Sequence, residues 1–538
     1  MRRSLLPLAL AGLLAACGSP PAATPPPSPA CDLADSPRCP DGARLLASVE
    51  ALASPALLGR RPGTPGNDEA ASLVEQAFLS AGLQPAAGLT GLRQPFQASL
   101  WSWAGPPTLA LGGEARALGA DYQLLDWTAA GDVTGPLSFA GYGLVLPAFD
   151  PAAFPDCPLA GGWDDFGGLD LTGRVAVVVS GLPGGVPLVS GACPARADCG
   201  GPGQPSCLTA ADKVAQARLR GATAVLLVPR SATAAGPRPF ASVPSTVPTL
   251  WVTFPALASA LPGLPGWIAA VDTQGPAPVA STVTARVATD GGARTATVVN
   301  VVGVIPGVDP VLRDEVVVVG AHFDHLGQLP FRPAYFPGAD DNASGTAVVM
   351  ELARLVGDSR LAPARTLVFA AWNGEELGLL GSRRWASAPP YPLAATAAAF
   401  SIDMVGVGQP GLQFAVAWEP GSELLTVAAG SAAALGLTEP LSFLAEPVFG
   451  SDHAPFSAAG VPSAWISTPT LALHPDYHTP GDRPGTIQPE VLAAAARLTW
   501  AAVRPWALGL EGPLLSPAVR VSRDRTPFPP ALERPLGP

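Results

Sequence analysis

The sequence predicts an α/β fold: a mixed, mostly parallel sheet sandwiched by helices, with a smaller domain inserted into the chain. Strand-like and helix-like segments alternate after Ala285, as they do in proteins with parallel sheets. The strand-like segments there are continuously apolar, which indicates strands buried on both faces. With 538 residues, 48% hydrophobic and 14% charged, the chain is long enough for more than one domain, and disorder throughout is excluded.

The charge of the chain argues against a nucleic-acid partner. The net charge is −11, and the 31 basic residues form no run that could follow a phosphate backbone. The 59 glycines and 64 prolines predict many loops, but no short repeat marks a low-complexity protein.

The first residues resemble an export signal. Two arginines precede an apolar run from Leu5 to Ala16, which is too short to span a bilayer as a mature helix. The run ends in LAAC, which resembles a bacterial lipobox and implies removal of residues 1–16 and lipidation of Cys17. Residues 17–40 would then be a Pro-rich tether, and the protein an exported lipoprotein of the bacterial cell envelope that meets the membrane only through Cys17. An ordinary signal followed by a chance cysteine is the alternative.

Six further cysteines favour disulfides, because their number is even and the chain is predicted to be exported. Many pairings are possible, and only a local bond between Cys31 and Cys39 is predicted. The chain has no CxxC spacing, so a cysteine zinc site is the weaker interpretation.

Residues 41–130 are predicted to form the first part of the catalytic domain. Apolar residues recur at helical spacing around Leu45 and again around Val74. The turn-forming residues 59–66 separate these two helices. The strands that follow, up to about residue 130, are only weakly marked.

Residues 131–285 resemble a separate inserted unit. Strands are predicted at 173–179 and 222–228 and a helix at 210–220, with four cysteines in the loops. The segments GYG, DDF, LTGRVAVVV and KVAQARLRGATAVLLV are similar to those of a protease-associated domain. We interpret this unit as a spacer that shapes access to a site elsewhere.

Residues 286–510 are predicted to form the second part of the catalytic domain, which carries the metal site, and the Pro-rich residues 511–538 a loose tail. The expected strands are 298–304, 315–319, 366–371, 398–404 and 461–467, and the expected helices are 343–356 and a segment from about Glu375.

Polar residues that can bind metals follow five of these strand or loop ends. In open α/β sheets, sites lie just beyond the carboxyl ends of the strands. Imidazole and carboxylate groups are zinc ligands, and a catalytic zinc site leaves one position open for water. The candidate groups, in chain order, are His322, Asp324, His325, Asp340, Asp341, Glu375, Glu376, Asp403, His478 and Asp482.

Three carboxylates and two histidines are enough for two metals that share one carboxylate. Such a pair can hold a hydroxide between the ions and steady the oxygen that develops charge during attack on a carbonyl. Glu375, next to a ligand but projecting differently, is the candidate base that carries the proton to the leaving amine. Asp324 follows His322 by two residues on the same strand face, so it is expected to accept the second ring N–H of that histidine.

The ordered motifs GAHFDHLG, GADDNASG, NGEELGLLGS, SIDMVG, SDHAPF and YHTPGD resemble the di-zinc exopeptidase family of bacterial leucyl-type aminopeptidases, glutamate carboxypeptidase and the transferrin receptor ectodomain. The amino-terminal segment GRRPGTPGNDEA and the protease-associated insert are similar too, so the resemblance spans most of the chain after Asp41. It implies the zinc exopeptidase, or phosphorylase/hydrolase-like, fold.

The resemblance also implies two Zn²⁺ per chain and the residues around them. The implied ligands are, for one ion, His322, Asp340 and Asp403 and, for the other, Asp340, Glu376 and His478. Glu375 would be the base, and either Tyr477 or His453 would lie near the tetrahedral oxyanion. A non-proline cis peptide bond after Asp340 is implied as well.

Other residues have plainer interpretations. His325 and His474 lack the ordered acidic partners and are expected to be structural or surface groups. Asp341 and Asp482 are either carboxylates that support the ligands or turn formers. Residues 340–351 nearly match a calcium loop, but two prolines precede them where such a loop needs a helix. The chain has no HExxH, Walker or GxSxG motif, which removes the main support for single-zinc proteases of that type, nucleotide hydrolases and serine hydrolases.

The sequence therefore predicts an exported zinc aminopeptidase that cleaves the amino-terminal bond of peptide substrates. One alternative is a carboxypeptidase or a single-zinc glutaminyl cyclase of the same fold. No basic cluster near the motifs offers a clamp for a substrate carboxylate, which favours the aminopeptidase, and the presence of both His322 and Asp403 favours two metals. The other alternative is a non-catalytic, receptor-like binding protein, although such relatives typically lose the metal ligands.

Overall fold

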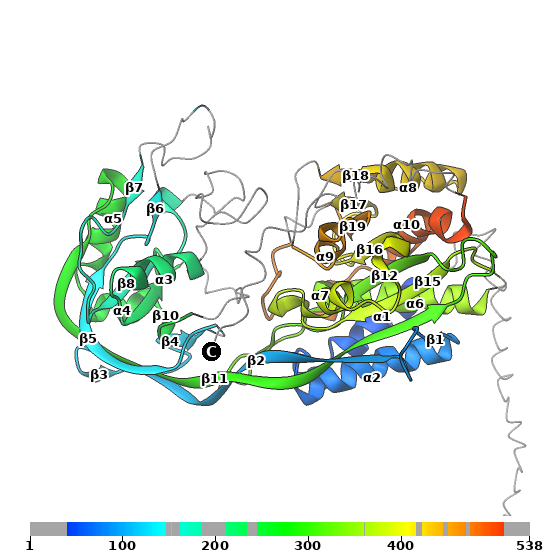
Figure 1. The fold of residues 1–538 in the computed structure, drawn as a ribbon. Coiled ribbons are helices and arrows are strands. Elements are labelled where there is room, and N and C mark those ends of the chain that lie inside the picture. The colour runs from blue at the N-terminus through cyan, green and yellow to red at the C-terminus, as the bar shows by residue number, and fades with distance from the viewer. Residues whose placement is uncertain are drawn as a thin grey trace, which may run out of the picture.

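Two lobes joined by a pair of long strands make up the molecule (Figure 1). Strands β2 (Arg93–Leu111) and β11 (Val279–Ile305) pair antiparallel and run from one lobe to the other. The computed structural model describes residues 40–125, 127–146, 152, 162–185, 210–233, 245–359, 361–415, 422–444, 450–469 and 474–510.

The sheet of the large lobe is mixed with a parallel centre, which confirms the predicted fold class. Its strands are β12 Val316–His322, β15 Thr366–Trp372, β16 Thr396–Ile402, β17 Leu412–Ala415, β18 Leu441–Leu444 and β19 Ser463–Ser467. They lie in the order β18-β17-β19-β16-β12-β15-β11. β19, β16, β12 and β15 are parallel neighbours, whereas β17 and β11 join antiparallel. Every residue of β12, β15 and β16 is buried, as their continuously apolar sequences predict.

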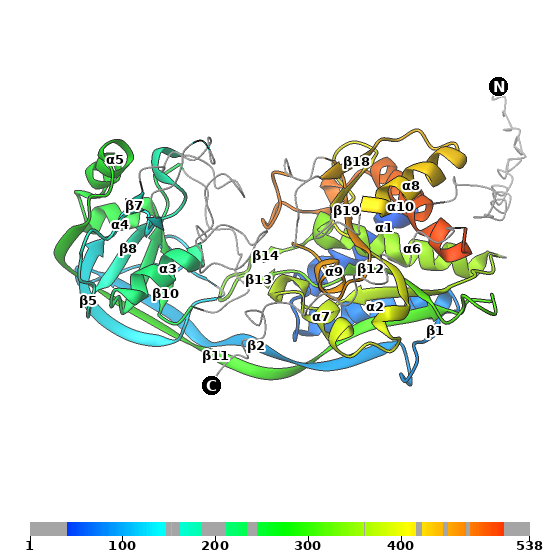
Figure 2. The same cartoon turned by 45° about the horizontal axis from the view of Figure 1, so that its top comes forward.

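Helices cover both faces of this sheet, and the layers can be followed in Figure 2. They are α1 Gly42–Leu52, α2 Pro65–Ser80, α6 Gly345–Asp358, α7 Leu380–Ser387, α8 Ser422–Ala434, α9 Ala454–Ala458 and α10 Pro489–Leu508. Val317 and Val319 of β12 share a core with residues of α1, α2, α6 and α10. Val316 and Val318 face the other way, into a core that contains Trp385 of α7. Successive strand residues point to opposite faces, so one apolar strand serves both layers.

Capping residues begin the first two helices, which confirms the helix pair predicted within residues 41–83. Asp41 accepts the N–H of Ala43 at the start of α1 (2.9 Å), and Thr64 accepts the N–H of Asn67 at the start of α2 (3.4 Å).

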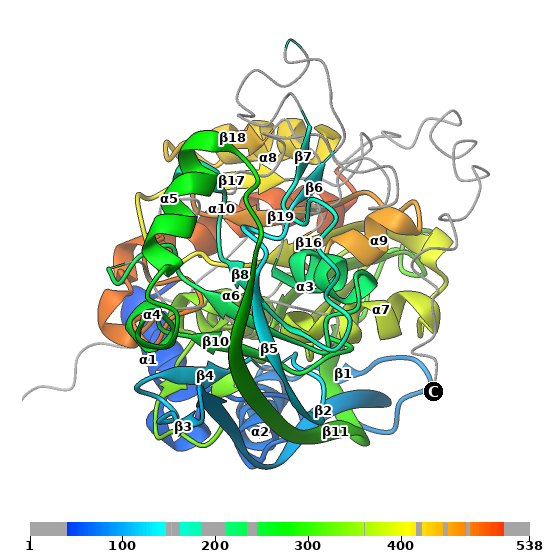
Figure 3. The same ribbon diagram turned by 90° about the vertical axis from the view of Figure 1, so that its left-hand side faces the viewer.

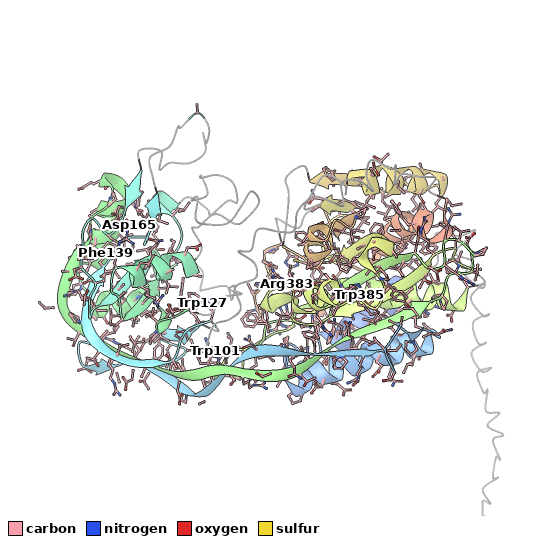
Figure 4. All side chains as sticks on the ribbon, in the orientation of Figure 1. Trp101, Trp127, Phe139, Asp165, Arg383 and Trp385 are labelled. Atoms are coloured by element: carbon pink, nitrogen blue, oxygen red, sulfur yellow. The ribbon has the colours of Figure 1, made fainter. Side chains whose placement is uncertain are left out.

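The small lobe has its own core and helices (Figure 3). Its strands are β4 Tyr122–Leu124, β5 Gly131–Phe139, β8 Val175–Val179, β9 Ala224–Val228 and β10 Thr249–Val252, and its helices are α3 Ala210–Leu219, α4 Phe254–Ala260 and α5 Leu264–Gln274. β5, β8, β9 and β10 are parallel neighbours that continue the sheet from β11. Phe139 and Asp165 lie inside this lobe, and Trp385 lies inside the large one (Figure 4). The strands and helix expected between residues 173 and 228 are therefore present.

The segments predicted after residue 286 are also present. The first expected strand is the end of β11, and the helix from about Glu375 begins as a single 3-10 turn before α7.

The short elements of the described chain are β1 Gln84–Pro85, β3 Glu114–Ala115, β6 Val145–Leu146, β7 Trp163–Asp164, β13 Gly327–Gln328, β14 Tyr335–Phe336, η1 Pro55–Leu57, η2 Pro183–Gly185, η3 Ala339–Ser344, η4 Glu375–Leu377, η5 Leu393–Ala395 and η8 Pro484–Thr486.

The small lobe begins earlier in the chain than the predicted insert, which starts at residue 131. Leu109 and Leu111 at the end of β2, and Tyr122 and Leu124 of β4, lie in the same apolar core as Leu137 of β5. Strand β2 continues from the large lobe into the small lobe and pairs with β11 in both, with a register shift near Asp290, so no turn or linker in the sequence marks the passage.

Several predictions fall outside the described residues. They are the signal at 1–16, the tether and lipidated Cys17, the Cys31–Cys39 bond, the other cysteines and the tail from 511. Among the described helices, no single one is long and apolar enough to cross a membrane. Helices α4 and α5 taken together are long and apolar enough, but the break between them bends the pair by 107°.

Candidate metal centre

The candidate site lies where three parallel strands end side by side. His322 is the last residue of β12, Asp403 directly follows β16, and Glu375 and Glu376 follow β15 after a turn at Gly374. Because β16, β12 and β15 are parallel neighbours, these side chains come to one edge of the sheet. The loop before α6 and the loop before α10 supply the other groups.

One group of ligand atoms forms around His322. Its Nε2 lies 3.3 Å from Oδ1 of Asp341, 3.5 Å from Oδ1 of Asp403 and 3.9 Å from Oε2 of Glu375. Ser451 donates to the other oxygen of Asp403 (2.7 Å), which orients that carboxylate. His322, Asp403 and Asp341 have side chains that are no more than 6% exposed.

A second group forms around His478. Its Nε2 lies 3.0 Å from Oδ2 of Asp341 and 3.1 Å from Oε2 of Glu376. His478 has φ 55°, a left-handed conformation that is costly for a residue with a Cβ. Asp341 therefore lies between the two groups, with one oxygen facing each histidine.

The structure places Asp341, and not the predicted Asp340, in the shared position. Oδ1 of Asp340 accepts the N–H of Gly406 (2.6 Å), and its Oδ2 lies 3.2 Å from Nε2 of His474. Neighbouring side chains of this loop point in different directions, and one sequence offers no signal that separates two adjacent aspartates. The cis peptide bond is likewise one residue later than predicted, between Asp341 and Asn342.

Buried hydrogen bonds hold Asp341 in place. Asp482, left open in the sequence as a supporting carboxylate or a turn former, accepts the main-chain N–H groups of Asp340 (2.8 Å) and Asp341 (3.0 Å). The side chain of Asn342 donates to Ile402 O (2.9 Å) and accepts from the N–H of Gly345 (2.9 Å). Asp482 is thus a support for the ligand loop.

Arg60 is a residue of this site that the sequence analysis missed. It is fully buried and donates to the main-chain oxygens of Phe323 (2.6 Å), Gly338 (2.6 Å), Pro337 and Leu52. One guanidinium thereby ties α1, the end of β12 and the ligand loop together. In the sequence, Arg60 stands in a loop of turn-forming residues, and such a loop gives no indication that its arginine side chain is buried.

Replacing Arg60 with methionine is expected to lower the free energy of unfolding by about 3–5 kcal/mol, because several buried carbonyls lose their donor at once. Urea denaturation followed by tryptophan fluorescence measures this change. The matched control is Arg313→Met, whose side chain is exposed and whose replacement is expected to cost less than about 0.5 kcal/mol. Equal stability of the two variants would contradict the role given to Arg60.

Asp324 has a different hydrogen bond from the predicted one. Its carboxylate lies 3.8 Å from Nδ1 of His322, beyond hydrogen-bond distance, whereas its main-chain oxygen lies 3.3 Å away. The carboxylate instead accepts the main-chain N–H of Glu375 (3.2 Å). Strand β12 ends at His322, so the strand geometry used in the prediction no longer applies at Asp324.

The two candidates for the oxyanion lie in different surroundings. The Tyr477 ring stacks on the His478 ring, with 3.9 Å between centroids. Burial and the nearby site carboxylates, Asp341 first among them, raise the pKa of Tyr477 well above its usual range. His453 packs against Trp465, with 6.3 Å between centroids.

Carboxylates dominate the electrostatics of the centre. Burial raises the pKa of Glu375 well above its usual range, and Glu376 and Asp452 raise it further while His322 opposes them. Burial also acts to raise the pKa of Asp341, but the imidazoles of His325, His322 and His478 prevail and hold it well below its usual range. So many buried acids require cationic partners.

The residues of the centre fit zinc. Zinc bonds of about 2.0–2.2 Å at tetrahedral angles place two ligand atoms roughly 3.3–3.5 Å apart. The distances from the His322 and His478 Nε2 atoms to the carboxylate oxygens of Asp341, Asp403 and Glu376 are close to this, at 3.0–3.5 Å. Oδ1 of Asp403 and Oε1 of Glu376 are buried and have no hydrogen-bond partner among the residues that the structure describes. His322, Asp341 and Asp403 would hold one ion, and Asp341, Glu376 and His478 the other.

The part of the chain that carries both ligand groups is similar to known peptidase sequences. Residues 300–503, which include both groups, match the family model described as peptidase family M28. Aminopeptidase YwaD of Bacillus subtilis is 34% identical over 202 residues, which cover 35% of this chain and 40% of that protein. Leupeptin-inactivating enzyme 1 of Streptomyces exfoliatus is 32% identical over 182 residues, which cover 34% of this chain and 37% of that protein. The chain thus spans less than half the length of these two relatives, and the predicted resemblance to this peptidase family is confirmed over the matched residues.

Solved structures share the fold over most of the chain. An aminopeptidase from Aneurinibacillus sp. strain AM-1 superimposes with a TM-score of 0.60 at 24% identity, covering 88% of this chain and 97% of that one. A zinc aminopeptidase from Bacillus subtilis has a TM-score of 0.60 at 22% identity, covering 87% and 95%. At such identities the likeness shows the shared fold.

Proposed function

We propose that this chain is a zinc-dependent aminopeptidase that holds two zinc ions and hydrolyses the amino-terminal bond of peptides. The observation that carries the proposal is the position of Asp341. Its two oxygens lie 3.3 Å from His322 and 3.0 Å from His478, each of which has a further carboxylate beside it. A shared carboxylate between two ligand groups is what two adjacent ions need. The family match and the names of the relatives support the same activity.

When bound, zinc supplies a Lewis acid that polarises a carbonyl and lowers the pKa of water. Glu375 is placed to move the proton. Its side chain is 12% exposed, against 4% for Glu376 and 6% for Asp403, so it is the more open to a substrate. Its turn is held by the hydrogen bond from its N–H to Asp324. The Glu375 carboxylate takes a proton from the attacking water and returns it to the leaving amine.

Tyr477 is favoured over His453 as the donor to the developing oxyanion. Its ring stacks directly on the ligand His478, whereas His453 packs against Trp465. A phenol that keeps its proton is a hydrogen-bond donor, and donors aimed at developing charge contribute most in a site with little water.

The charge of the centre favours a substrate amine over a substrate carboxylate. Six buried and two partly buried acids surround the two ligand groups: Asp324, Asp340, Asp341, Asp403, Asp452 and Asp482, with Glu375 and Glu376. Two divalent ions would leave this set negative. The fully buried Arg60 donates to main-chain oxygens and is not available to clamp a carboxylate.

Export and anchoring remain part of the proposal. The arginines, apolar run and Cys17 at the start of the sequence support an exported lipoprotein whose partners are peptides.

The purified protein is expected to contain about two zinc ions per chain and to release the first residue of an unblocked tetrapeptide, detected by mass spectrometry. The same peptide with an acetylated amino terminus is the matched control and is expected to stay intact. Release of the last residue would make the protein a carboxypeptidase, and cyclisation of an amino-terminal glutamine would make it a glutaminyl cyclase. A protein that binds no zinc and cleaves neither peptide would be the receptor-like alternative.

A further inference from the structure

The ribbon of β2 and β11 between the lobes is only two strands wide for part of its length. β11 pairs with β5 of the small lobe up to Thr289 and with β15 of the large lobe from Val301. Between these residues its partner among the described strands is β2 alone. No residue of β11 is buried at 290–293, and none is buried at the facing positions 101–105 of β2. Two strands without a buried face are marginally stable, so this stretch is the part of the ribbon that is least held in shape.

The pairing of the ribbon is irregular at the same place. The register of β2 and β11 shifts between Ala288 and Asp290 and again between Asp290 and Gly291. Gly292 follows this irregularity, and Gly105 faces Asp290 from β2. A Cβ at Gly292 or at Gly105 would meet no atom within 4 Å, so no packing contact restrains the main chain there. Bulges and glycines within strands mark positions where strands bend.

The metal centre faces the small lobe. β15 runs antiparallel to β11, with Leu367 beside Ile305 and Ala371 beside Val301. β11 enters the large lobe from the small one, so β15 and its parallel neighbours point their carboxyl ends back toward the small lobe (Figure 1). The metal ligands follow those ends. A movement of the small lobe about the ribbon therefore changes the space in front of the centre.

A hairpin next to the ligands reaches from the large lobe to the small one (Figure 2). Its strands β13 and β14 lie in the chain between the ligands His322 and Asp341. At its tip, the side chain of Gln328 donates to Arg332 O (2.9 Å). A Cβ at Gly119, in the small-lobe loop before β4, would lie 3.2 Å from Nε of Arg332. The side chain of Arg332 thus lies against the main chain of the small lobe.

The base of the hairpin is fixed to the large lobe. A Cβ at Gly59 would lie 2.3 Å from Phe336 O and 2.8 Å from Gly327 O, so the hairpin packs directly on the main chain of that loop. Arg61 donates to Leu326 O (3.2 Å), just before β13. A hairpin with a fixed base and a tip that contacts the other lobe opposes movement of the two lobes apart.

We infer that the small lobe turns about a hinge at residues 288–292 and 101–105, and that the contact of Arg332 with Gly119 holds it in the position seen here. The hinge is independent of the proposed function, whereas its consequence for substrates rests on that function. When the contact is broken, the small lobe moves away from the metal centre and longer peptides gain access. The chemistry at the metals is unchanged, because neither residue of the contact is a ligand.

The first test measures the hinge without activity. Nitroxide labels on non-natural amino acids at the exposed positions Glu69 of α2 and Gln274 of α5 report the distance between the lobes by electron spin resonance. Arg332→Ala is expected to lengthen the mean distance and to broaden its distribution. Gly105→Val combined with Gly292→Val is expected to narrow the distribution, because valine favours the extended strand and removes the freedom of glycine. Neither glycine has a positive φ, so valine fits without strain. A wild-type distribution in either variant would overturn the inference.

The second test compares a long and a short substrate. Arg332→Ala is expected to raise kcat/KM for an unblocked peptide of about ten residues by at least about threefold, because the open position becomes more populated. The double valine variant is expected to lower the same value by a similar factor. Hydrolysis of an aminoacyl anilide is expected to stay at the wild-type rate in both variants. Equal changes for the two substrates would overturn the inference, since the effect would then lie in the metal centre.

Two control variants match these changes outside the hinge and the hairpin. Arg313→Ala removes an exposed arginine before β12, at the end of the sheet opposite the metal centre. Gly91→Val places valine where a Cβ also meets no atom within 4 Å. Both are expected to keep the wild-type distance distribution and the wild-type kcat/KM for both substrates, and a change in either control as large as in the test variants would overturn the inference. A wild-type protein that cleaves neither substrate would contradict the proposed function, while the distance measurement would still decide the hinge.

Discussion

Replacing Glu375 with glutamine is expected to leave both zinc ions bound and to lower kcat by about 10²–10⁴-fold, the usual contribution of a general base. Glutamine has nearly the same shape as glutamate but cannot take a proton. Glu375 lies 3.9 Å from His322, farther than Asp341 and Asp403 at 3.3–3.5 Å, and it is the most exposed of these three acids, so we assign it as the base and not as a ligand. Steady-state hydrolysis of an aminoacyl anilide, together with zinc content by mass spectrometry, measures both effects.

Glu50→Gln on α1 is the matched control for this prediction, because the same chemical change occurs there at an exposed position. Its kcat and zinc content are expected to equal those of the wild type. Loss of zinc from Glu375→Gln would show that Glu375 is a ligand and would leave the centre without its assigned base.

Replacing Asp341 with asparagine is expected to lower the affinity for both zinc ions by more than about 100-fold, since one residue serves both groups. Activity would fall with the metal content. The matched substitution Asp340→Asn changes the adjacent residue in the same way, but its oxygen can still accept the N–H of Gly406, so two ions are expected to remain. Zinc titration of the two variants side by side measures the difference.

This pair of variants decides between the position predicted from the sequence and the one seen in the structure. If Asp340→Asn lost the metals while Asp341→Asn kept them, the shared ligand would be Asp340 and the geometry around Asp341 would have no functional meaning. Circular dichroism on both variants shows whether either change has unfolded the chain.

The strands and the kinds of ligand could be predicted from the sequence because both depend on local chemistry. Continuously apolar runs predict buried parallel strands, and β12, β15 and β16 are such strands. Parallel strands end at one edge, so His322, Glu376 and Asp403 had to come near one another wherever the helices lay. The class of fold and the acid and imidazole content of the site followed from these two facts.

The direction of each side chain in the irregular loops was decided only by tertiary contacts. Asp341 faces the histidines because Asp482, 141 residues away in the chain, accepts its N–H. His325 turns inward against Gly338, and Arg60 reaches the ligand loop from 278 residues away. Such contacts have no period that a sequence pattern could reveal. The extent of the small lobe was equally hidden, because β2 passes from one core to the other as an unbroken strand.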